Sequence, residues 1–557
     1  MSTDASVKTL VDKIADGELI LPEMQRDYVW KSTNVRDLFD SLYRGYPSGV
    51  ILVWETDELV ETRDFAVETS NQRSSKWLLL DGQQRLTSLA AILSGDGVTV
   101  KDRKRDVRLL FNLEHPDELQ FDFEDEVDET EEDEETQELL QERLNRNTFM
   151  VYSKKMAQLS QWVDVSDIFQ KNDREILMEA GVTGFDDPRY EKYTDRLEKV
   201  RAIAKYPYHL EVLDRHKTYD EVTEIFVRVN SLGVKLRSSD LALAQITAKW
   251  RGALDIFTEY QKSARDSLDF DIDMGIILRA LVALITNQSR FQRVGSLSLD
   301  MLKKGWDRTT RAFDFALNYV KSNLGIDTTL LLSSPVLLVT TAYWGDNRNF
   351  QISEEDSANF KRWFLIANAK GHYSGSSETK LDQDISIIRN GGGGKELLDK
   401  LLTEVGRLDF TANELRGRNT NSGAFKTLFM ALRADGVKDW ESNLEISTKH
   451  KGESDRIENH HIFPKKYLER VRPDLTTSNN KQINQIANMA FIGGLTNRHI
   501  SDKAPNDYRQ NYDSRLLASQ LIDFCDGRDK PENFEQFIDR RLNLMAAKLN
   551  EFLGVGE

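Results

Sequence analysis

Residues 457–468 read IENHHIFPKKYL, and this stretch sets two histidines, His460 and His461, next to each other. In an extended segment adjacent side chains point to opposite faces, so the two imidazoles cannot easily do the same job. One can bind a divalent metal ion while its neighbour activates water. Four of the chain's eight histidines fall within residues 450–499, and such clustering favours a site.

Two asparagines follow the histidine pair. Asn488 comes 27 positions after His461, and Asn497 comes nine positions after Asn488. The apolar run MAFIGGL, residues 489–495, predicts a strand and a turn before a polar helix start. We therefore expect a hairpin followed by a helix. A structural zinc site and ordinary buried histidines are the alternatives, but Cys525 is the only thiol and has no CxxC partner.

The second informative stretch is KWLLLDGQQRLTSLAAIL, residues 76–93. An apolar run suited to a buried strand is broken by Asp81-Gly82, after which apolar residues recur at helical spacing. The first-turn N–H groups of such a helix form an anion site, and Arg85 adds a positive fork that suits phosphate. Side chains that merely solvate a helix start are the alternative.

The C-terminal residues resemble a known family. HHIFPKKYL, the nine-residue spacing of the asparagines and NRHISDKAPNDY are similar to the HNH, or ββα-metal, nuclease domain of GmrSD-type restriction proteins, over roughly residues 410–550. The resemblance implies that His461 is the general base and that His460 and Asn497 hold one Mg²⁺ or Mn²⁺ ion. It further implies that Asn488 braces the loop orienting His461, and Lys503 is placed to contact a phosphate oxygen.

Three N-terminal segments resemble the nucleotide-binding domain of the same proteins, which is related to the ParB and sulfiredoxin fold. They are LPEMQRDYVW at 21–30, DGQQRLT at 81–87 and EIFVRVNSLG at 224–233. The resemblance implies an NTP-dependent domain, with GTP, ATP, CTP and UTP all left open. The nucleotide-binding candidates are Arg26, Asp81, Gly82, Gln83, Gln84, Arg85, Thr87, Arg228 and Asn230. No GxxxxGK[ST] loop occurs, so a P-loop NTPase is not supported.

Aromatic residues beside the first of these segments suggest a sensing role. Gln25, Tyr28 and Trp30 could pack around an extruded base or an altered group on DNA. The alternative is that Tyr28 and Trp30 fill the core of the N-terminal domain, which is the more usual role of aromatic residues.

Length and composition suggest several α+β domains. We expect a ParB/sulfiredoxin-like α/β domain at 1–245, a helical connecting domain at 246–405 and the ββα-metal nuclease domain within a helical surround at 406–557. An acidic insertion at 117–138 holds fourteen Asp and Glu residues and no Lys or Arg, and accounts for most of the net charge of −17. In the helical region, His372, Tyr373 and Lys380 are predicted to be solvated loop residues, with nucleic-acid contact as the alternative.

The sequence thus predicts a modification-dependent restriction endonuclease that cuts modified or phage double-stranded DNA. A nucleotide-driven sensor would license the nuclease. No apolar stretch approaches the ~20 residues needed to cross a bilayer, and no signal peptide is evident, which predicts a cytoplasmic protein. Two alternatives stay open: a nucleotide-regulated ParB-like DNA-binding protein with an inactive HNH module, and a nuclease that cuts RNA. Whether the active form is a homodimer is also open.

Overall fold

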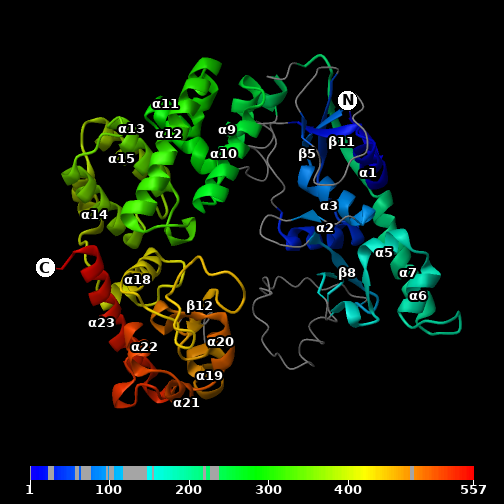
Figure 1. Ribbon diagram of the computed structural model, residues 1–557. Coiled ribbons are helices and arrows are strands. Elements are labelled where there is room, and N and C mark those ends of the chain that lie inside the picture. Colours follow the sequence, from blue (N-terminus) through cyan, green and yellow to red (C-terminus); the bar gives the residue numbers. More distant parts are fainter. Residues whose placement is uncertain are drawn as a thin grey trace. The chain divides into compact units, whose positions relative to one another are not determined.

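The computed structural model describes residues 2–22, 30–56, 62–63, 77–95, 98–99, 106–116, 147–153, 156–217, 221–225, 238–476 and 482–556. The chain divides into two compact units, Met1–Leu254 and Asp255–Glu557 (Figure 1). The domain boundaries predicted after residues 245 and 405 stay predictions. The helical region after residue 254 and the C-terminal region belong to the same compact unit, because α14 (Glu354–Lys370) packs against α18 (Gly423–Ala434) and α23 (Phe534–Leu553).

The first unit is built on a mixed sheet with strand order β1-β11-β3-β5-β2-β4. Pairing is parallel between β11 and β3 and between β2 and β5, and antiparallel elsewhere. The strands are β1 (Ser2–Ser6), β2 (Leu19–Pro22), β3 (Ile51–Glu55), β4 (Thr62–Arg63), β5 (Trp77–Asp81) and β11 (Pro207–Leu213). The other described strands of this unit form a smaller sheet, in the order β10-β8-β9, and the pair β6-β7. They are β6 (Val98–Thr99), β7 (Asp106–Val107), β8 (Leu109–Asn112), β9 (Phe149–Val151) and β10 (Trp162–Asp164).

The helices of the first unit bury both faces of the six-stranded sheet near β5, and α5 packs on the smaller sheet. They are α1 (Val7–Ala15), α2 (Ser32–Tyr43), α3 (Gln83–Ser94), α5 (Val165–Gln170), α6 (Asp173–Glu179), α7 (Tyr190–Arg201) and α9 (Ser238–Lys249). Leu79 joins the core formed with α1, α2 and α3, whereas Leu78 and Leu80 join a second core with Trp54 and Ala244. Successive strand residues alternate in direction, so a continuous apolar run is what a strand buried on both faces requires.

The second unit is mainly helical. Its first part contains α10 (Ala253–Leu268), α11 (Met274–Thr286), α12 (Leu299–Leu324), α13 (Val336–Asn347), α14, α15 (Ser377–Arg389) and α16 (Gly394–Val405). Its second part contains α17 (Ala412–Leu415), α18, β12 (Ile457–His461), α19 (Lys465–Val471), β13 (Met489–Gly493), α20 (Gly494–Ile500), α21 (Pro505–Tyr508), α22 (Ser514–Ser519) and α23. The predicted α+β, multidomain class is confirmed. Within the described ranges, no helix is both long and apolar enough to cross a lipid bilayer.

The loop at 371–376 corrects one prediction. His372 and Tyr373 were expected to be solvated or to face nucleic acid, but both are buried. The Asp384 carboxylate accepts hydrogen bonds from Tyr373 Oη at 2.6 Å, from the His372 ring at 2.8 Å and from Lys400 Nζ at 2.8 Å. The polar loop composition was misleading because a buried carboxylate 11–12 residues further along supplies these groups with partners.

Candidate active site

The histidine pair lies on the two-stranded sheet of the second unit. β12 and β13 pair antiparallel, with His460 opposite Ala490 and His461 opposite Met489. α20 begins directly after β13 and carries Asn497. The predicted order of strand, strand and helix is therefore present. Because adjacent residues of β12 point to opposite faces, the two histidines have different neighbours.

His460 faces α20. Its Nδ1 atom lies 2.7 Å from Asn497 Oδ1. The other atom of that amide, Asn497 Nδ2, donates to Glu458 Oε2 at 2.7 Å. Glu458 precedes His460 by two positions and so lies on the same face of β12. The His460 ring is 3% exposed and makes edge contacts with Trp440 and Tyr508.

The environment of His460 fits a metal ligand. Burial lowers the pKa of His460 to about 4, a shift that the Asn497 hydrogen bond opposes, so the ring is neutral near pH 7. A metal ligand must be a neutral imidazole nitrogen with a free lone pair. In the metal-free ring Asn497 Oδ1 can only accept, so Nδ1 carries the proton, and an ion held there by Nδ1 requires the other tautomer, with the proton on Nε2. Among the described residues, no three His, Cys, Asp or Glu side chains gather as a metal site. The amide oxygen of Asn497 suits Mg²⁺ or Mn²⁺, and Mg²⁺ keeps several of its waters, so a site with few protein ligands can hold it.

His461 faces Asn484, which was not among the predicted site residues. Its Nε2 atom lies 2.9 Å from Asn484 Oδ1. Asn484 stands 23 residues further along, in the segment that leads into β13. Asn488, at the end of this segment, is fully buried: its Oδ1 accepts from Phe463 N at 2.9 Å, and its Nδ2 donates to Phe463 O and Ile483 O, each at 3.0 Å. Asn488 thus ties the chain just after β12 to the segment that carries Asn484.

Three further buried polar side chains hold β13 and the chain just before it, and none of them was predicted as a site residue. Asp439 accepts from Gly493 N at 2.7 Å. Gln520 pairs with the backbone N–H and C=O of Phe491, at 2.8 and 2.7 Å. Arg541 of α23 donates to Ala487 O at 2.9 Å and Gln520 O at 3.1 Å. No local sequence signal marks them, because each acts on backbone far away along the chain.

Lys503 and His499 lie on the surface near α20. Lys503 Nζ donates to His499 O at 2.7 Å, and the His499 ring lies 3.0 Å from the Glu441 carboxylate. Both residues are exposed. The predicted contact of Lys503 with phosphate therefore stays a prediction that its exposure permits.

The predicted phosphate-binding turn is present in the first unit. β5 ends at Asp81, and Gly82, with φ of 99°, starts α3. The positive φ at Gly82 favours glycine, and a Cβ atom there would also push Ile51 Cδ1 aside. Gln83 and Gln84 open the helix, and Gln84 Oε1 accepts from Trp30 N at 3.1 Å.

Arg85 has structural partners in this turn. Its guanidinium donates to Ser48 O at 2.5 Å, to Val50 O at 2.8 Å and to Asp81 Oδ2 at 3.0 Å. These bonds fix the chain that leads into β3 against the start of α3. A role for Arg85 at a phosphate stays a prediction. Thr87 is 1% exposed, and its hydroxyl has no hydrogen-bond partner among the described atoms.

The other N-terminal candidates divide into two groups. Trp30 is partly buried and packs against the main core of the first unit, as the packing alternative expects. Gln25, Arg26, Tyr28, Arg228 and Asn230, like the acidic insertion at 117–138, lie outside the described residues.

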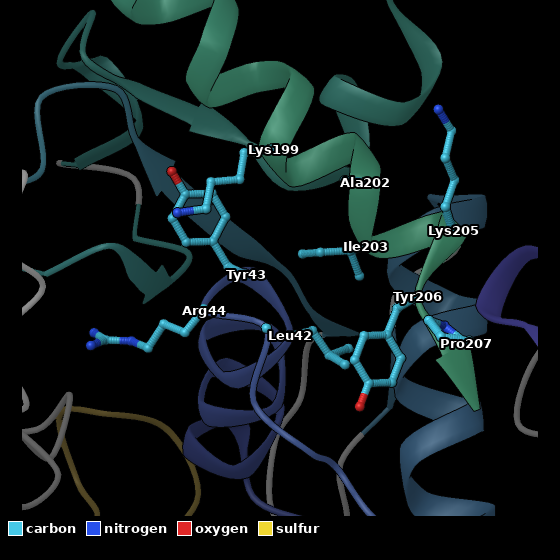
Figure 2. Close-up of a pocket in the computed structure, with 10 residues that line it drawn as sticks. Leu42, Tyr43, Arg44, Lys199, Ala202, Ile203, Lys205, Tyr206 and Pro207 are labelled. Carbon is cyan, nitrogen blue, oxygen red and sulfur yellow. The ribbon is translucent and has the colours of Figure 1, made fainter. Parts of the chain in front are cut away.

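A pocket of about 400 Å³ opens elsewhere in the first unit, between the end of α2 and the connection from α7 to β11. Figure 2 shows the rings of Tyr43 and Tyr206 and the amino group of Lys199 among its lining residues. Lys199 Nζ lies 4.5 Å from the centre of the Tyr43 ring. None of the predicted site residues lines this pocket.

Comparison with known proteins covers both ends of the chain. The N-terminal domain of the GmrSD restriction endonucleases matches residues 7–247, and their C-terminal domain matches residues 407–548. The uncharacterized protein MJ0686 of Methanocaldococcus jannaschii is 24% identical over an alignment 620 residues long, which covers 98% of each chain. The C-terminal match contains β12, β13 and α20, and the N-terminal match contains β5 and α3. Since the two matches together span more than half of the chain, this protein belongs to the GmrSD restriction endonuclease family.

Proposed function

We propose that this protein is a metal-dependent DNA endonuclease whose active site is formed by β12, α20 and the segment that leads into β13, and that a nucleotide bound in the first unit regulates it. The observation that carries the proposal is the pairing of His460 with Asn497 and of His461 with Asn484 on opposite faces of one strand. A metal-binding group and a base are thereby held one residue apart. Family membership supports DNA as the substrate.

The chemistry divides between the two histidines. His460 Nδ1 and Asn497 Oδ1 would hold Mg²⁺ or Mn²⁺, which when bound supplies stabilisation of the negative charge that develops on the phosphate and the leaving oxygen. The His461 ring accepts a proton from the attacking water, whose oxygen forms the new bond to phosphorus as the bond to the leaving oxygen breaks. Asn488 keeps the chain after His461 in place, and Lys503 offers a positive charge to the phosphate backbone.

The nucleotide proposal rests on the turn between β5 and α3. The N-terminus of a twelve-residue helix, with Gln83 and Gln84 in its first turn, suits an anionic phosphate. Asp81 and Arg85 bind each other at this turn and help to fix its shape. We propose that Arg26, Arg228 and Asn230 complete the nucleotide site and that the Tyr28 region senses modified bases.

A cleavage assay tests the endonuclease. Wild-type protein should cut phage DNA with Mg²⁺ or Mn²⁺ and stop when a chelator is added. His461→Ala should reduce the rate on the order of 10²–10⁴-fold, as expected for loss of a general base. His450→Ala, which changes a partly exposed histidine outside the site, should cut like wild type. Equal cutting by His461→Ala and wild type would contradict the assignment.

Substrate and nucleotide are separated in the same assay. Plain DNA, modified phage DNA and RNA are compared with each NTP present in turn. Cutting that requires modified DNA and one NTP supports the gated nuclease. Efficient cutting of RNA alone would favour the alternative that the sequence left open.

A further inference from the structure

The contact between His461 and Asn484 constrains the chemistry of the histidine ring. Asn484 Oδ1 can only accept a hydrogen bond, so the ring nitrogen that faces it, Nε2, must carry a proton. A neutral imidazole with its proton on Nε2 has its lone pair on Nδ1. Asn484 therefore selects both the tautomer and the orientation of the His461 ring.

Asn484 is in turn held by buried bonds on both sides of its segment. Asn488 Nδ2 donates to Ile483 O, the carbonyl immediately before Asn484, and also to Phe463 O just after β12. Arg541 donates to Ala487 O at the other end of the segment. The distance from Asn484 to the His461 ring thus depends on two buried anchors, one of which belongs to α23.

Burial of the Arg541 side chain in the core is energetically unfavourable. Its side chain is 1% exposed, and burial lowers its pKa to about 9. Within the described part of the chain it forms no ion pair, and its two hydrogen bonds go to backbone carbonyls. An apolar side chain of similar size would often serve stability equally well. The retained guanidinium is therefore best explained by the position of the carbonyl that it holds.

We propose that Asn484 is a positioning residue that fixes the tautomer of the His461 ring, and that Arg541 keeps Asn484 within reach of that ring. This inference rests on the proposed nuclease function. Neither residue touches the substrate, so their loss should lower the rate of the chemical step more than the binding of DNA or metal.

Variants of Asn484 test the first half. Asn484→Leu should lower the single-turnover cleavage rate on the order of 10–100-fold, the usual effect of losing a side chain that orients a site residue. The KM for DNA and the affinity for Mn²⁺ should stay within about threefold of wild type. Asn484→Asp keeps an accepting oxygen at the same place and should recover most of the rate. Asn413→Leu, at an exposed position of the same unit, is the matched control.

The tautomer itself can be observed without any cleavage. In metal-free protein labelled with ¹⁵N-histidine, the ring signals of His461, assigned through a His461→Gln variant, should report a proton on Nε2. In Asn484→Leu the signals should shift toward a mixture of tautomers. Unchanged His461 signals in Asn484→Leu would overturn the proposal.

A double-mutant comparison tests the second half. Arg541→Met alone should slow cleavage in a folded protein, and adding it to Asn484→Leu should cause little further loss, because both changes act through the same ring. Multiplied losses would show that Arg541 acts independently and would overturn its assigned role. Asn543→Ala, on the exposed face of α23, is the control.

The outcomes separate this inference from the function on which it rests. If His461→Ala cuts like wild type, the proposed function fails and the positioning role fails with it. If His461→Ala is inactive while Asn484→Leu is fully active, the nuclease stands and only the positioning role is wrong.

Discussion

Replacing Asp439 should loosen the junction between β13 and α20. The Asp439 carboxylate is 1% exposed, and one of its oxygens accepts from Gly493 N at 2.7 Å, where β13 ends. The other accepts from Thr496 Oγ1 at 2.9 Å, in the first turn of α20. The residue next to Thr496 is Asn497, the proposed metal ligand. Asp439 therefore connects the sheet that carries the histidines with the helix that faces His460.

The size of the effect follows from which donors can reach water. Glu441 N and the Ser442 backbone and hydroxyl groups also donate to Asp439, but these two residues are exposed and can turn to solvent. Gly493 and Thr496 are buried and cannot. Leaving a buried donor unpaired costs about 1–3 kcal/mol, so Asp439→Ala should weaken this junction by about 2–6 kcal/mol.

Hydrogen–deuterium exchange of the full-length protein measures this loss locally. A chain of two compact units need not unfold in one step, so a global midpoint would be hard to interpret. Under conditions where exchange reports the opening equilibrium, peptides that cover 489–500 should exchange at least about 30-fold faster in Asp439→Ala, which corresponds to about 2 kcal/mol. Asp439→Asn should also lose protection, because the N–H₂ group of the new side-chain amide would face one of the two buried donors, Gly493 N or Thr496 Oγ1.

The control removes only the exposed side of the same carboxylate. Ser442→Ala deletes one hydroxyl donor and should change the opening free energy by less than about 1 kcal/mol. If Asp439→Ala leaves exchange of peptides 489–500 within about threefold of wild type, the two buried donors have other partners and the reasoning fails. An equal effect of Ser442→Ala and Asp439→Ala would refute the distinction between buried and exposed donors.

Two further predictions concern other parts of the chain. Burial opposes the ionisation of Asp384, but the hydrogen bonds and charge of His372 and Lys400 hold its pKa below the ordinary 3.8. Its stabilising contribution is therefore present above about pH 4 and is lost as pH falls through the lower folded-state pKa. Exchange of peptides that cover 371–389 should differ between wild type and Asp384→Asn at pH 7 and converge below about pH 4; a constant difference across this pH range would contradict this. In the first unit, Gly82→Ala should destabilise the turn before α3 by more than about 1 kcal/mol, detected as faster exchange of peptides within 77–95, whereas Gly184→Ala, where a Cβ meets nothing within 4 Å, should have little effect. Equal exchange in the two glycine variants would show that the turn tolerates a side chain.

The local elements of both sites were predictable from the sequence. A continuous apolar run, a glycine and a helical repeat predict β5, the turn at Gly82 and α3, because each signal spans only a few adjacent residues. The pairing of His460 with Asn497 was expected only from the resemblance to the nuclease domain. The nine-residue spacing of the asparagines is one of the motifs that carry this resemblance.

Contacts between distant segments could not be predicted in this way. The place of Arg85 in the turn predicts a role at a phosphate, which stays a prediction, but nothing near it in the sequence indicates its bonds to the carbonyls of Ser48 and Val50, 37 and 35 positions earlier. Asn484 occupies a polar segment with no helical or strand period, so nothing distinguishes it from a solvated loop residue. Arg541 occurs in an amphipathic helix, where an arginine is normally exposed, and only the fold shows that it is buried.

The accuracy of the candidate active site depends on the register of β12 against β13. A slip of one residue would turn His460 toward the face of His461 and His461 toward α20, which would exchange the proposed metal ligand and the proposed base. The pair is only five residues long on each strand, so its own backbone bonds resist such a slip weakly. Gln520 binds both polar backbone groups of Phe491, and Asp439 binds Gly493 N, so these two side chains hold β13 in place. The chain directly after β12 is held as well, because Asn488 binds Phe463 N and O and Tyr508 Oη donates to Ile462 O. A slip of β12 against β13 would break the bonds at Ile462 and Phe463. The buried polar groups around the two strands therefore determine which histidine does which chemistry.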